Sequence, residues 1–516
     1  MIRMVEHVAN RQVDCAFNLL VLPPTMIFTN RYLELGEEFY QQTSPQPVAQ
    51  PSLIIFNHEL AKEFAGSLST FDEHMLTQMF SGNQVHESSV PLAMAYAGHQ
   101  FGHFNPQLGD GRAIYLGELT RLEGGSMDVQ LKGSGRTRFS RGGDGRSALG
   151  PVLREYLLSE AMHKLGVPTT RALAAVSSGE QVWREQKIPG GVITRIASSF
   201  IRVGTFQYFA AQQDLDSLQK LADYVLECNY PEHSNGEDKY LALFKAVVTR
   251  QAQLIAKWMC LGFIHGVMNT DNMSIAGETI DYGPCAFMDY FRYDQVYSFI
   301  DKRGRYAYQE QPSIGLWNLT RLAEALLPLF NEDVDVAVEQ ATSILKGFAP
   351  HYDAAWLINM RSKLGLTASV NDAEDKSLVE GLLNTMAESE ADFTLAFHHL
   401  SQMDASANEK DESFHGLFSN SEKIKDWLRQ WRKRLELETQ TDTERQAQMG
   451  AINPVYIPRN HQIEKVIRAA EDNNNFEPFH ELHTVLENPF TYQQGKDTYM
   501  QPPKPGEVVV NTFCGT

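Results

Sequence analysis

Three short segments of the chain carry residues suited to binding a polyphosphate and a divalent cation. They are the glycine-rich turn Leu108-Gly-Asp-Gly-Arg112, the segment Val129-Gln-Leu-Lys132, and Asn272 with the later Asp281-Tyr-Gly283. Glycines let a backbone approach a phosphate closely, and a lysine supplies positive charge. Amide and carboxylate oxygens are ligands that Mg²⁺ accepts. Together these residues predict a site for a nucleotide and its metal ion.

Lys132 belongs to a predicted strand, in which successive side chains point to opposite faces. It therefore shares a face with Gln130, while Val129 and Leu131 occupy the other face. A predicted helix carrying Glu155 follows. Kinases hold their phosphate-binding lysine with a helix glutamate in this order, so we predict an ion pair between Lys132 and Glu155.

Cations are concentrated around this lysine. Residues 132–146 contain five cations and only one acid, Asp144, in a chain whose net charge is −19. Such a loop is either an anion site or a solvated basic segment. Arg195 and Arg202 lie on two predicted consecutive strands among apolar neighbours. Buried arginines need a fixed anionic partner, which is either a protein carboxylate or a phosphate group.

The loop that contains Asn272 departs from the kinase pattern. Kinases begin their catalytic loop with His-Arg-Asp, whereas this chain has His265-Gly-Val267. Asp271 is the only carboxylate of the loop and immediately precedes Asn272. The nucleotide-binding parts are therefore present while the usual catalytic aspartate is absent. A zinc-protease helix, a P-loop and a nucleophile elbow are also missing from the sequence.

The elements that must position these residues change character along the chain. Short strands are predicted at 113–119, 127–132, 191–196 and 200–203, with a helix at 148–165. Further helices are predicted at 240–261, 318–348, 352–364, 376–400, 420–440 and 461–472, with a polar linker or helix end at 440–450. This order predicts an α+β protein with a two-lobed, protein-kinase-like fold. Its expected parts are an N-terminal extension (1–90), a nucleotide-binding region (91–210), a helical region with the catalytic loop (211–445) and a C-terminal tail (446–516).

Composition limits the classes of partner. The 516 residues include 45 Lys and Arg against 64 Asp and Glu, so bulk charge does not favour nucleic acid or an anionic membrane. No run approaches the roughly 20 apolar residues that span a bilayer. The five cysteines are scattered and form no Cys-x-x-Cys pair. We therefore expect a cytoplasmic protein with reduced thiols. We also expect it to be bacterial and to act as a monomer.

Several longer motifs resemble those of the selenoprotein O family (SelO, also called YdiU). They are Tyr96-Ala-Gly-His-Gln-Phe-Gly-His103, the 108–112 turn, Ser140-Arg-Gly-Gly-Asp-Gly-Arg146, the 265–283 segment and Asn453-Pro-Val-Tyr-Ile-Pro-Arg-Asn-His461. The resemblance runs over nearly the whole chain. It implies a pseudokinase fold that binds ATP in a flipped orientation. It also implies transfer of AMP, with Mg²⁺ or Mn²⁺, to Ser, Thr or Tyr hydroxyls of protein substrates.

The resemblance also implies roles for individual residues. Asp271 would be the catalytic base, Asn272 and Asp281 would hold the metal, and Glu155 would pair with Lys132. Arg138 stands where relatives have proline, which affects the expected shape of that loop. The nucleotide would be contacted by Gly109, Gly111, Arg112, Lys132, Asp144, Gly145, Arg195, Arg202 and Asp281.

Eukaryotic members of the family carry selenocysteine near the C-terminus, where this chain has Cys514. The resemblance implies a disulfide between Cys514 and Cys285 that would regulate activity, and two unrelated reduced thiols are the alternative. Two other functions also fit the residues: γ-phosphoryl transfer, as in small-molecule kinases, and an ATP-binding scaffold without catalysis. The joint presence of Lys132, Glu155 and the metal-binding pair argues against the scaffold. The residues do not distinguish ATP from UTP as the donor.

Overall fold

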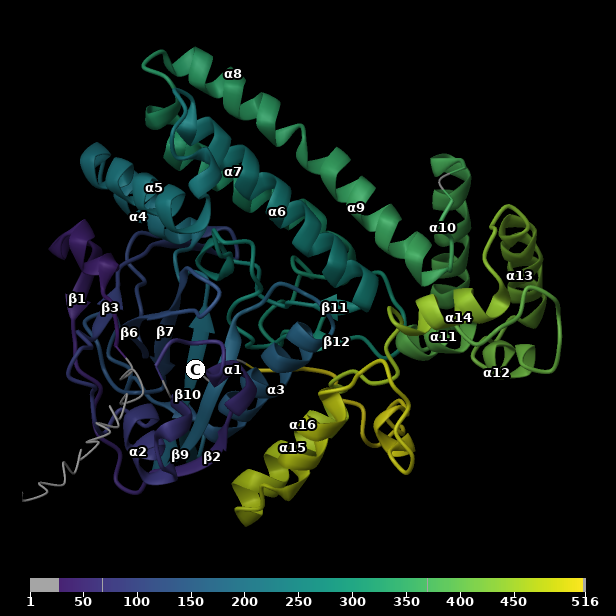
Figure 1. The fold of residues 1–516 in the computed structure, drawn as a ribbon, viewed down its shortest axis with the longest axis horizontal. Coiled ribbons are helices and arrows are strands. Elements are labelled where there is room, and N and C mark those ends of the chain that lie inside the picture. The colour runs from purple at the N-terminus through teal and green to yellow at the C-terminus, as the bar shows by residue number, and fades with distance from the viewer. Residues whose placement is uncertain (1–26, 67, 369, 514–516) are drawn as a thin grey trace, which may run out of the picture.

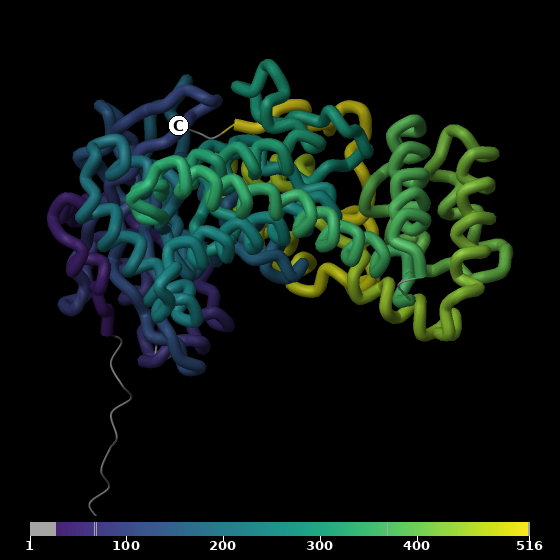
Figure 2. Tube along the Cα trace, turned by 90° about the horizontal axis from the view of Figure 1, so that it is seen from above, coloured from purple at the N-terminus to yellow at the C-terminus, as the bar shows by residue number. Residues whose placement is uncertain are grey.

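A computed structural model describes residues 27–66, 68–368 and 370–513 of the chain. It is a mixed α/β protein in which an antiparallel sheet comes first and a largely helical region follows (Figure 1). Figure 2 shows the helices of residues 372–450 gathered at the end of the molecule opposite the sheet. None of the helices in the described ranges is long and apolar enough to cross a membrane.

The main sheet contains eight strands among the described residues, in the order β1-β3-β6-β7-β10-β9-β2, with β8 paired to β10. The strands are β1 (Tyr40–Gln42), β2 (Ser52–Phe56), β3 (Leu92–Met94), β6 (Ala113–Thr120), β7 (Ser126–Lys132), β8 (Ser147–Ala148), β9 (Arg171–Trp183) and β10 (Lys187–Ala197). The strands predicted at 113–119, 127–132 and 191–196 are confirmed within β6, β7 and β10. Residues before position 90 supply β1 and β2, so this segment completes the sheet.

Two small hairpins stand apart from the main sheet. β4 (Gly98–Gln100) pairs with β5 (His103–Asn105), and β11 (Phe263–Ile264) pairs with β12 (Ala286–Phe287). The second hairpin brackets the loop that contains Asp271 and Asp281. Its two strands therefore fix both ends of that loop.

The strand predicted at 200–203 is wrong. Residue 202 makes only an isolated bridge to Ser274, and helix α4 (Val203–Ala211) begins directly after it. The backbone N–H of Arg202 donates to the hydroxyl of Thr205 at 3.1 Å, which is the reciprocal contact of a helix N-terminal cap. The helical period of the residues that follow therefore overrides the apolar pattern that suggested a strand.

Helix α3 (Leu149–Lys164) carries Glu155 and is buried along most of its length. It packs against β9 and β10 on one side and against α15 (Asn460–Asn473) and α16 (Glu477–Leu486) on the other, as Figure 1 shows. The Gly150 N–H donates to Glu471 Oε1 at 2.9 Å, and Arg154 donates to Asn460 Oδ1 at 2.9 Å. The C-terminal helices therefore hold this helix in place.

The helices after residue 215 agree with the predicted ones in part. The predicted 240–261 helix is confirmed, whereas 318–348 and 376–400 are each interrupted, at Asn331 and at Glu390. Residues 440–450 contain a helix that begins with a Thr441–Glu444 capping box. The bounds are α1 (His58–Ala61), α2 (Glu73–Phe80), α5 (Leu215–Asn229), α6 (Lys239–Leu261), α7 (Gln311–Phe330), α8 (Val334–Leu345), α9 (Phe348–Lys363), α10 (Asp372–Ser389), α11 (Phe393–Leu400), α12 (Asp411–His415), α13 (Ser421–Leu435) and α14 (Asp442–Gly450).

The main sheet has apolar cores on both faces. Val129 and Leu131 of β7 belong to the smaller core with α1 and α2. The larger core joins the opposite face to α3 and the helical region. Burial of Val129 and Leu131 turns Gln130 and Lys132 the other way, as strand alternation requires. The two cores therefore fix the direction in which Lys132 points.

Candidate functional site

A cavity of about 660 Å³ opens where the sheet, α3 and the loop between β11 and β12 meet. Its size falls within the range of small-molecule sites in proteins. The sequence-predicted residues that line it are Gly109, Gly111, Arg112, Lys132, Asp144, Gly145, Glu155, Arg195, Arg202, Asp271, Asn272 and Asp281. Residues far apart in the sequence thus contribute to one site.

Two cations from neighbouring strands share two carboxylates in this cavity. Lys132 Nζ lies 2.7 Å from Glu155 Oε2 and 3.2 Å from Asp281 Oδ1. Arg195 lies 2.6 Å from the same Asp281 oxygen and 3.3 Å from Glu155 Oε1. The register of β7 and β10 sets Ile193 opposite Lys132, which brings the two cations close together.

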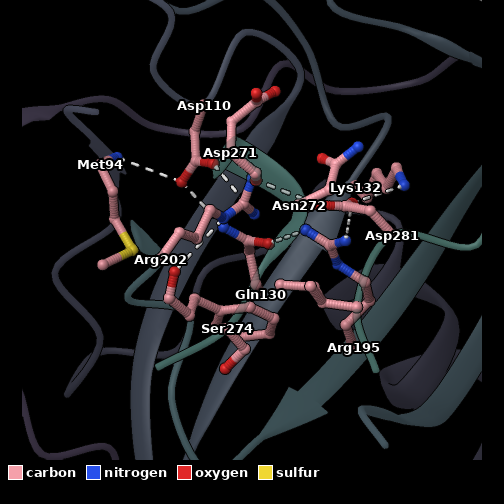
Figure 3. Close-up of polar contacts among 12 residues, drawn as sticks. Met94, Asp110, Gln130, Lys132, Arg195, Arg202, Asp271, Asn272, Ser274 and Asp281 are labelled. Carbon is pink, nitrogen blue, oxygen red and sulfur yellow. Dashed lines mark hydrogen bonds and ion pairs between the residues drawn. The ribbon is translucent and has the colours of Figure 1, made fainter. Parts of the chain in front are cut away.

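Arg202 joins the same cluster from the start of α4. Its guanidinium lies 3.2 Å from Asp281 Oδ2 and 3.9 Å from Asp110 Oδ1, and it donates to the Asp271 carbonyl at 3.0 Å (Figure 3). It also stacks on the Tyr96 ring, with 4.6 Å to the ring centroid. Arg195 and Arg202 are both almost completely buried, at 2% and 3% exposure. Their anionic partners in this structure are protein carboxylates.

Asp281 is the centre of this charge cluster. Burial by itself would raise the pKa of its carboxyl, but Arg202, Lys132 and Arg195 hold that pKa well below its usual range. Its backbone is left-handed, with φ of 61°, a conformation that a residue with a side chain rarely adopts. The surrounding ion pairs therefore hold both its charge and its position.

The sequence did not identify Asp110 and Gln130 as site residues. Gln130 donates to Asp110 Oδ2 at 2.8 Å and accepts a hydrogen bond from Arg195, and the Met94 N–H donates to Asp110 at 3.2 Å (Figure 3). Asp110 stands between two glycines, where an aspartate is typical of a turn. Strand alternation places Gln130 on the same face as Lys132, and this pattern could have identified Gln130 as a site residue.

Two glycines of the site permit no side chain. Gly109 has φ of 68°, and a Cβ there would lie 2.2 Å from the Phe139 ring. Gly145 also has φ of 68°, and a Cβ there would lie 2.1 Å from the Gly135 carbonyl oxygen. The glycine-rich turn therefore packs closely on Phe139, and Gly145 packs on the backbone at the start of its own loop; both glycines line the cavity.

The basic loop is partly tied down and partly open. Asp144 forms an ion pair with Arg184 at 2.8 Å, and Arg146 donates to the carbonyls of residues 46 and 47 at 2.9 Å each. By contrast, Arg112 and Arg141 line the cavity and form no ion pair within the described ranges. Cations that face a cavity without carboxylate partners favour an anion site over a solvated loop.

Asp271 and Asn272 also line the cavity. Gln100 donates to Asp271 Oδ2 at 3.2 Å, while Oδ1 is buried without a hydrogen-bond partner in the described structure. Burial raises the pKa of Asp271 to about 6, although Gln100 and Arg202 act against this shift. The Asn272 amide donates to the Val267 carbonyl at 3.0 Å. No hydrogen bond in the described ranges uses the amide oxygen of Asn272.

The donor set suits a metal ion that arrives with a nucleotide. Within the described residues, no group of three or more His, Cys, Asp or Glu side chains is arranged to hold a metal. Asn272 and Asp281 offer one amide and one carboxylate to the same cavity. Mg²⁺ in nucleotide sites is bound by one or two carboxylates together with phosphates and water. The two residues therefore fit such an ion.

Cys285 lies outside the cavity lining but follows Pro284, which belongs to it. The Cys285 side chain is buried. The C-terminal segment reaches this point, since the Thr512 hydroxyl donates to the Pro284 carbonyl at 2.6 Å. Cys514 lies outside the described residues.

Comparison with known proteins gives a consistent result. A family model described as protein adenylyltransferase SelO matches residues 24–487. The protein nucleotidyltransferase YdiU of Agrobacterium fabrum is 52% identical over 491 residues, which cover 95% of this chain and 100% of that protein. The YdiU proteins of Bradyrhizobium sp. (strain BTAi1) and Rhizobium meliloti are each 53% identical over 489 residues, covering 95% of this chain and 99% of each relative.

Proposed function

The chain belongs to the protein adenylyltransferase SelO family and is a nucleotidyltransferase, and we propose that it transfers AMP from ATP to Ser, Thr or Tyr hydroxyls of protein substrates. One observation carries the proposal. The phosphate-binding cations, the metal-binding pair and the buried carboxylate of Asp271 all line a single cavity.

The architecture that we propose is a two-lobed, kinase-like fold. The sheet with the Lys132–Glu155 pair would form the nucleotide-binding lobe (91–210), and the helices with the 265–283 loop would form the second lobe (211–445). Residues 1–90 and 446–516 would be extensions, the first of which adds β1 and β2 to the sheet. The contacts of α15 and α16 with α3 support a positioning role for the C-terminal extension. The scattered cysteines favour a cytoplasmic location, and we propose that the protein acts as a monomer.

In the proposed reaction the acceptor hydroxyl oxygen attacks the α-phosphorus of ATP. The bond between that phosphorus and the oxygen bridging to the β-phosphate breaks, so pyrophosphate leaves and AMP is joined to the protein. Asp271 would accept the hydroxyl proton, since a pKa of about 6 leaves it ionised at neutral pH. Arg195 and Arg202 would grip the terminal phosphates, which leaves the α-phosphate open to attack. A divalent cation, Mg²⁺ or Mn²⁺, held by Asn272 and Asp281 would neutralise phosphate charge.

We also propose redox control through Cys285 and Cys514. The hydrogen bond between Thr512 and Pro284 supports this proposal. Thr512 lies two residues before Cys514, and Pro284 immediately precedes Cys285, so the bond brings the two parts of the chain together. A disulfide would fasten the C-terminal segment beside the cavity. Non-reducing peptide mapping of oxidised protein, with Cys514→Ala as control, should yield a 285–514 linked peptide. The absence of that peptide, with activity insensitive to reductants, would contradict the disulfide.

The position of the label in ATP tests the reaction. With a whole-cell protein extract as acceptor, label on the α-phosphate should become protein-bound, whereas label on the γ-phosphate should not. Asp271→Asn should preserve ATP binding and lower transfer by roughly 10²–10⁴-fold if Asp271 is a general base. Transfer of the γ-label would favour a kinase, and no transfer of either label would favour a scaffold. α-Labelled UTP in the same assay measures the donor preference.

A further inference from the structure

A group of cations and aromatic side chains borders the cavity beside Asp271. We call it the basic rim and define it as residues 99–104 of the β4–β5 hairpin, the loop 299–306, and Trp317 of α7. Phe101 and Ile300 of this rim line the cavity. The hairpin also carries Gln100, whose amide donates to Asp271. The rim is therefore adjacent to the proposed catalytic base.

Arg305 joins the three parts of the rim. Its guanidinium lies over the Trp317 ring, at 4.7 Å from the ring centroid. The guanidinium also lies against the hairpin turn: a Cβ added to Gly102 would be 3.7 Å from Cζ of Arg305. Tyr306 packs on Phe101 at 5.1 Å between ring centroids and donates to Asn269 at 2.6 Å. The Nε of Arg305 is buried without a hydrogen-bond partner in the described structure. Aromatic packing thus fixes this cation in place.

The rim has more positive charge than the protein itself balances. Lys302, Arg303 and Arg305 form no ion pair within the described ranges. Asp301, the only acid of residues 299–306, accepts the backbone N–H groups of Arg305 (3.0 Å) and Tyr306 (2.7 Å). Its carboxylate therefore shapes the loop, and in a chain of net charge −19 the three cations remain available to an external anion.

The position of the rim favours a polypeptide over the nucleotide as that anion. The cations proposed for the phosphates come from β7, β10, the start of α4 and the glycine-rich turns, whereas the rim comes from the β4–β5 hairpin, the loop after β12 and α7. An acceptor hydroxyl at Asp271 would bring its neighbouring residues close to Gln100, which donates to Asp271, and to Phe101, which lines the same cavity. An extended chain advances about 3.3 Å per residue, so side chains two or three positions away lie about 7–10 Å from the hydroxyl.

We propose that the basic rim binds the acceptor segment of the protein substrate and selects hydroxyls flanked by acidic residues. This proposal rests on the proposed adenylyl transfer. The cations would pair with Asp or Glu side chains of the substrate. Ile300 (59% exposed) and Phe104 (42% exposed) would cover its apolar atoms. The protein's overall negative charge would repel a strongly acidic partner at long range. The rim would therefore select a short acidic sequence around the hydroxyl and not an acidic protein as a whole.

The test uses the full chain, α-labelled ATP and synthetic peptides with one central tyrosine. One peptide has glutamate at the flanking positions, a second has lysine, and a third has glycine and serine. We expect kcat/KM for the glutamate peptide to exceed that for the lysine peptide by at least tenfold, and this preference should shrink at high salt. The triple variant Lys302→Gln, Arg303→Gln, Arg305→Gln should reduce the preference to below threefold while the KM for ATP stays unchanged.

A matched control removes exposed cations elsewhere. Lys346→Gln with Lys433→Gln changes two exposed residues that form no ion pair in the described ranges, and it should leave the preference intact. Label transfer without a preference for the glutamate peptide would overturn the rim proposal but not the adenylyl transfer. A rise in the KM for ATP in the triple variant would also overturn it, since the rim would then serve the nucleotide. Absence of any α-label transfer, to peptides or to a protein extract, would contradict the proposed function itself.

Discussion

Replacing Asp281 with asparagine should destabilise the protein in the absence of nucleotide. Three buried cations, Lys132, Arg195 and Arg202, face three carboxylates, from Asp281, Glu155 and Asp110. Asp281 contacts all three cations, at 2.6–3.2 Å. Removing one charge of a buried ion-pair network typically costs about 3–5 kcal/mol, because the remaining charges lose their compensation. We therefore expect a loss of that size in the free energy of unfolding of Asp281→Asn.

The assay is denaturation by urea and by heat, with and without ATP and Mg²⁺. Without metal, ATP should stabilise Asp281→Asn more than the unmodified protein, because the uncompensated cations attract the phosphates and ligand binding raises stability. Adding Mg²⁺ should give the variant little further gain. Asp144→Asn is the matched control. The Asp144 side chain, which pairs with Arg184, is 39% exposed, so this ion pair should contribute less than about 1 kcal/mol to the free energy of unfolding. Equal stability of Asp281→Asn and the unmodified protein would refute the charge balance on which this reasoning rests.

Two further predictions concern phosphate contacts and a buried amine. Arg195→Met and Arg202→Met should weaken ATP binding far more than AMP binding, since a charge-assisted hydrogen bond contributes about 1.5–3 kcal/mol; equal losses in calorimetric titrations would make both arginines structural. Lys363 is buried over the Phe397 ring, and burial lowers its pKa to about 7. Between about pH 7 and 10 the unfolded chain binds this proton and the folded chain does not, so the unmodified protein gains stability as pH rises. Lys363→Met should thus raise Tm most at pH 6, and an advantage that does not change with pH would contradict the prediction.

Local patterns predicted the parts of the site that a single element determines. The alternation of Val129 and Leu131 fixed the direction of Lys132, because both apolar side chains enter the core on the other face of β7. Glycine at 109 indicated close backbone approach, and the structure gives it a left-handed φ. These features depend on residues within a few positions of each other. Such patterns are what a sequence displays directly.

The features that the sequence did not predict depend on distant segments. Arg202 reads as a strand residue, but the segment after it forms α4, which places the guanidinium between Asp110 and Asp281. The contacts of α15 and α16 with α3 join positions about 320 apart, such as Gly150 and Glu471. No periodicity in the sequence marks such a pairing. Tertiary packing therefore decided the helix and strand assignments where local preference was weak.

The balance of charge in the cavity has a consequence for how ligands enter it. Asp281 contacts Lys132, Arg195 and Arg202 and, together with Glu155 and Asp110, balances their charge. These cations are therefore not free to hold phosphates while Asp281 keeps all its contacts. A nucleotide alone would bring excess negative charge to Asp281, and a metal ion alone would meet three cations around its only carboxylate ligand. When both arrive, Asp281 can turn to the metal while the arginines turn to the phosphates, and the local charge stays near balance. Metal and nucleotide should therefore bind cooperatively, each raising the affinity for the other by the same factor.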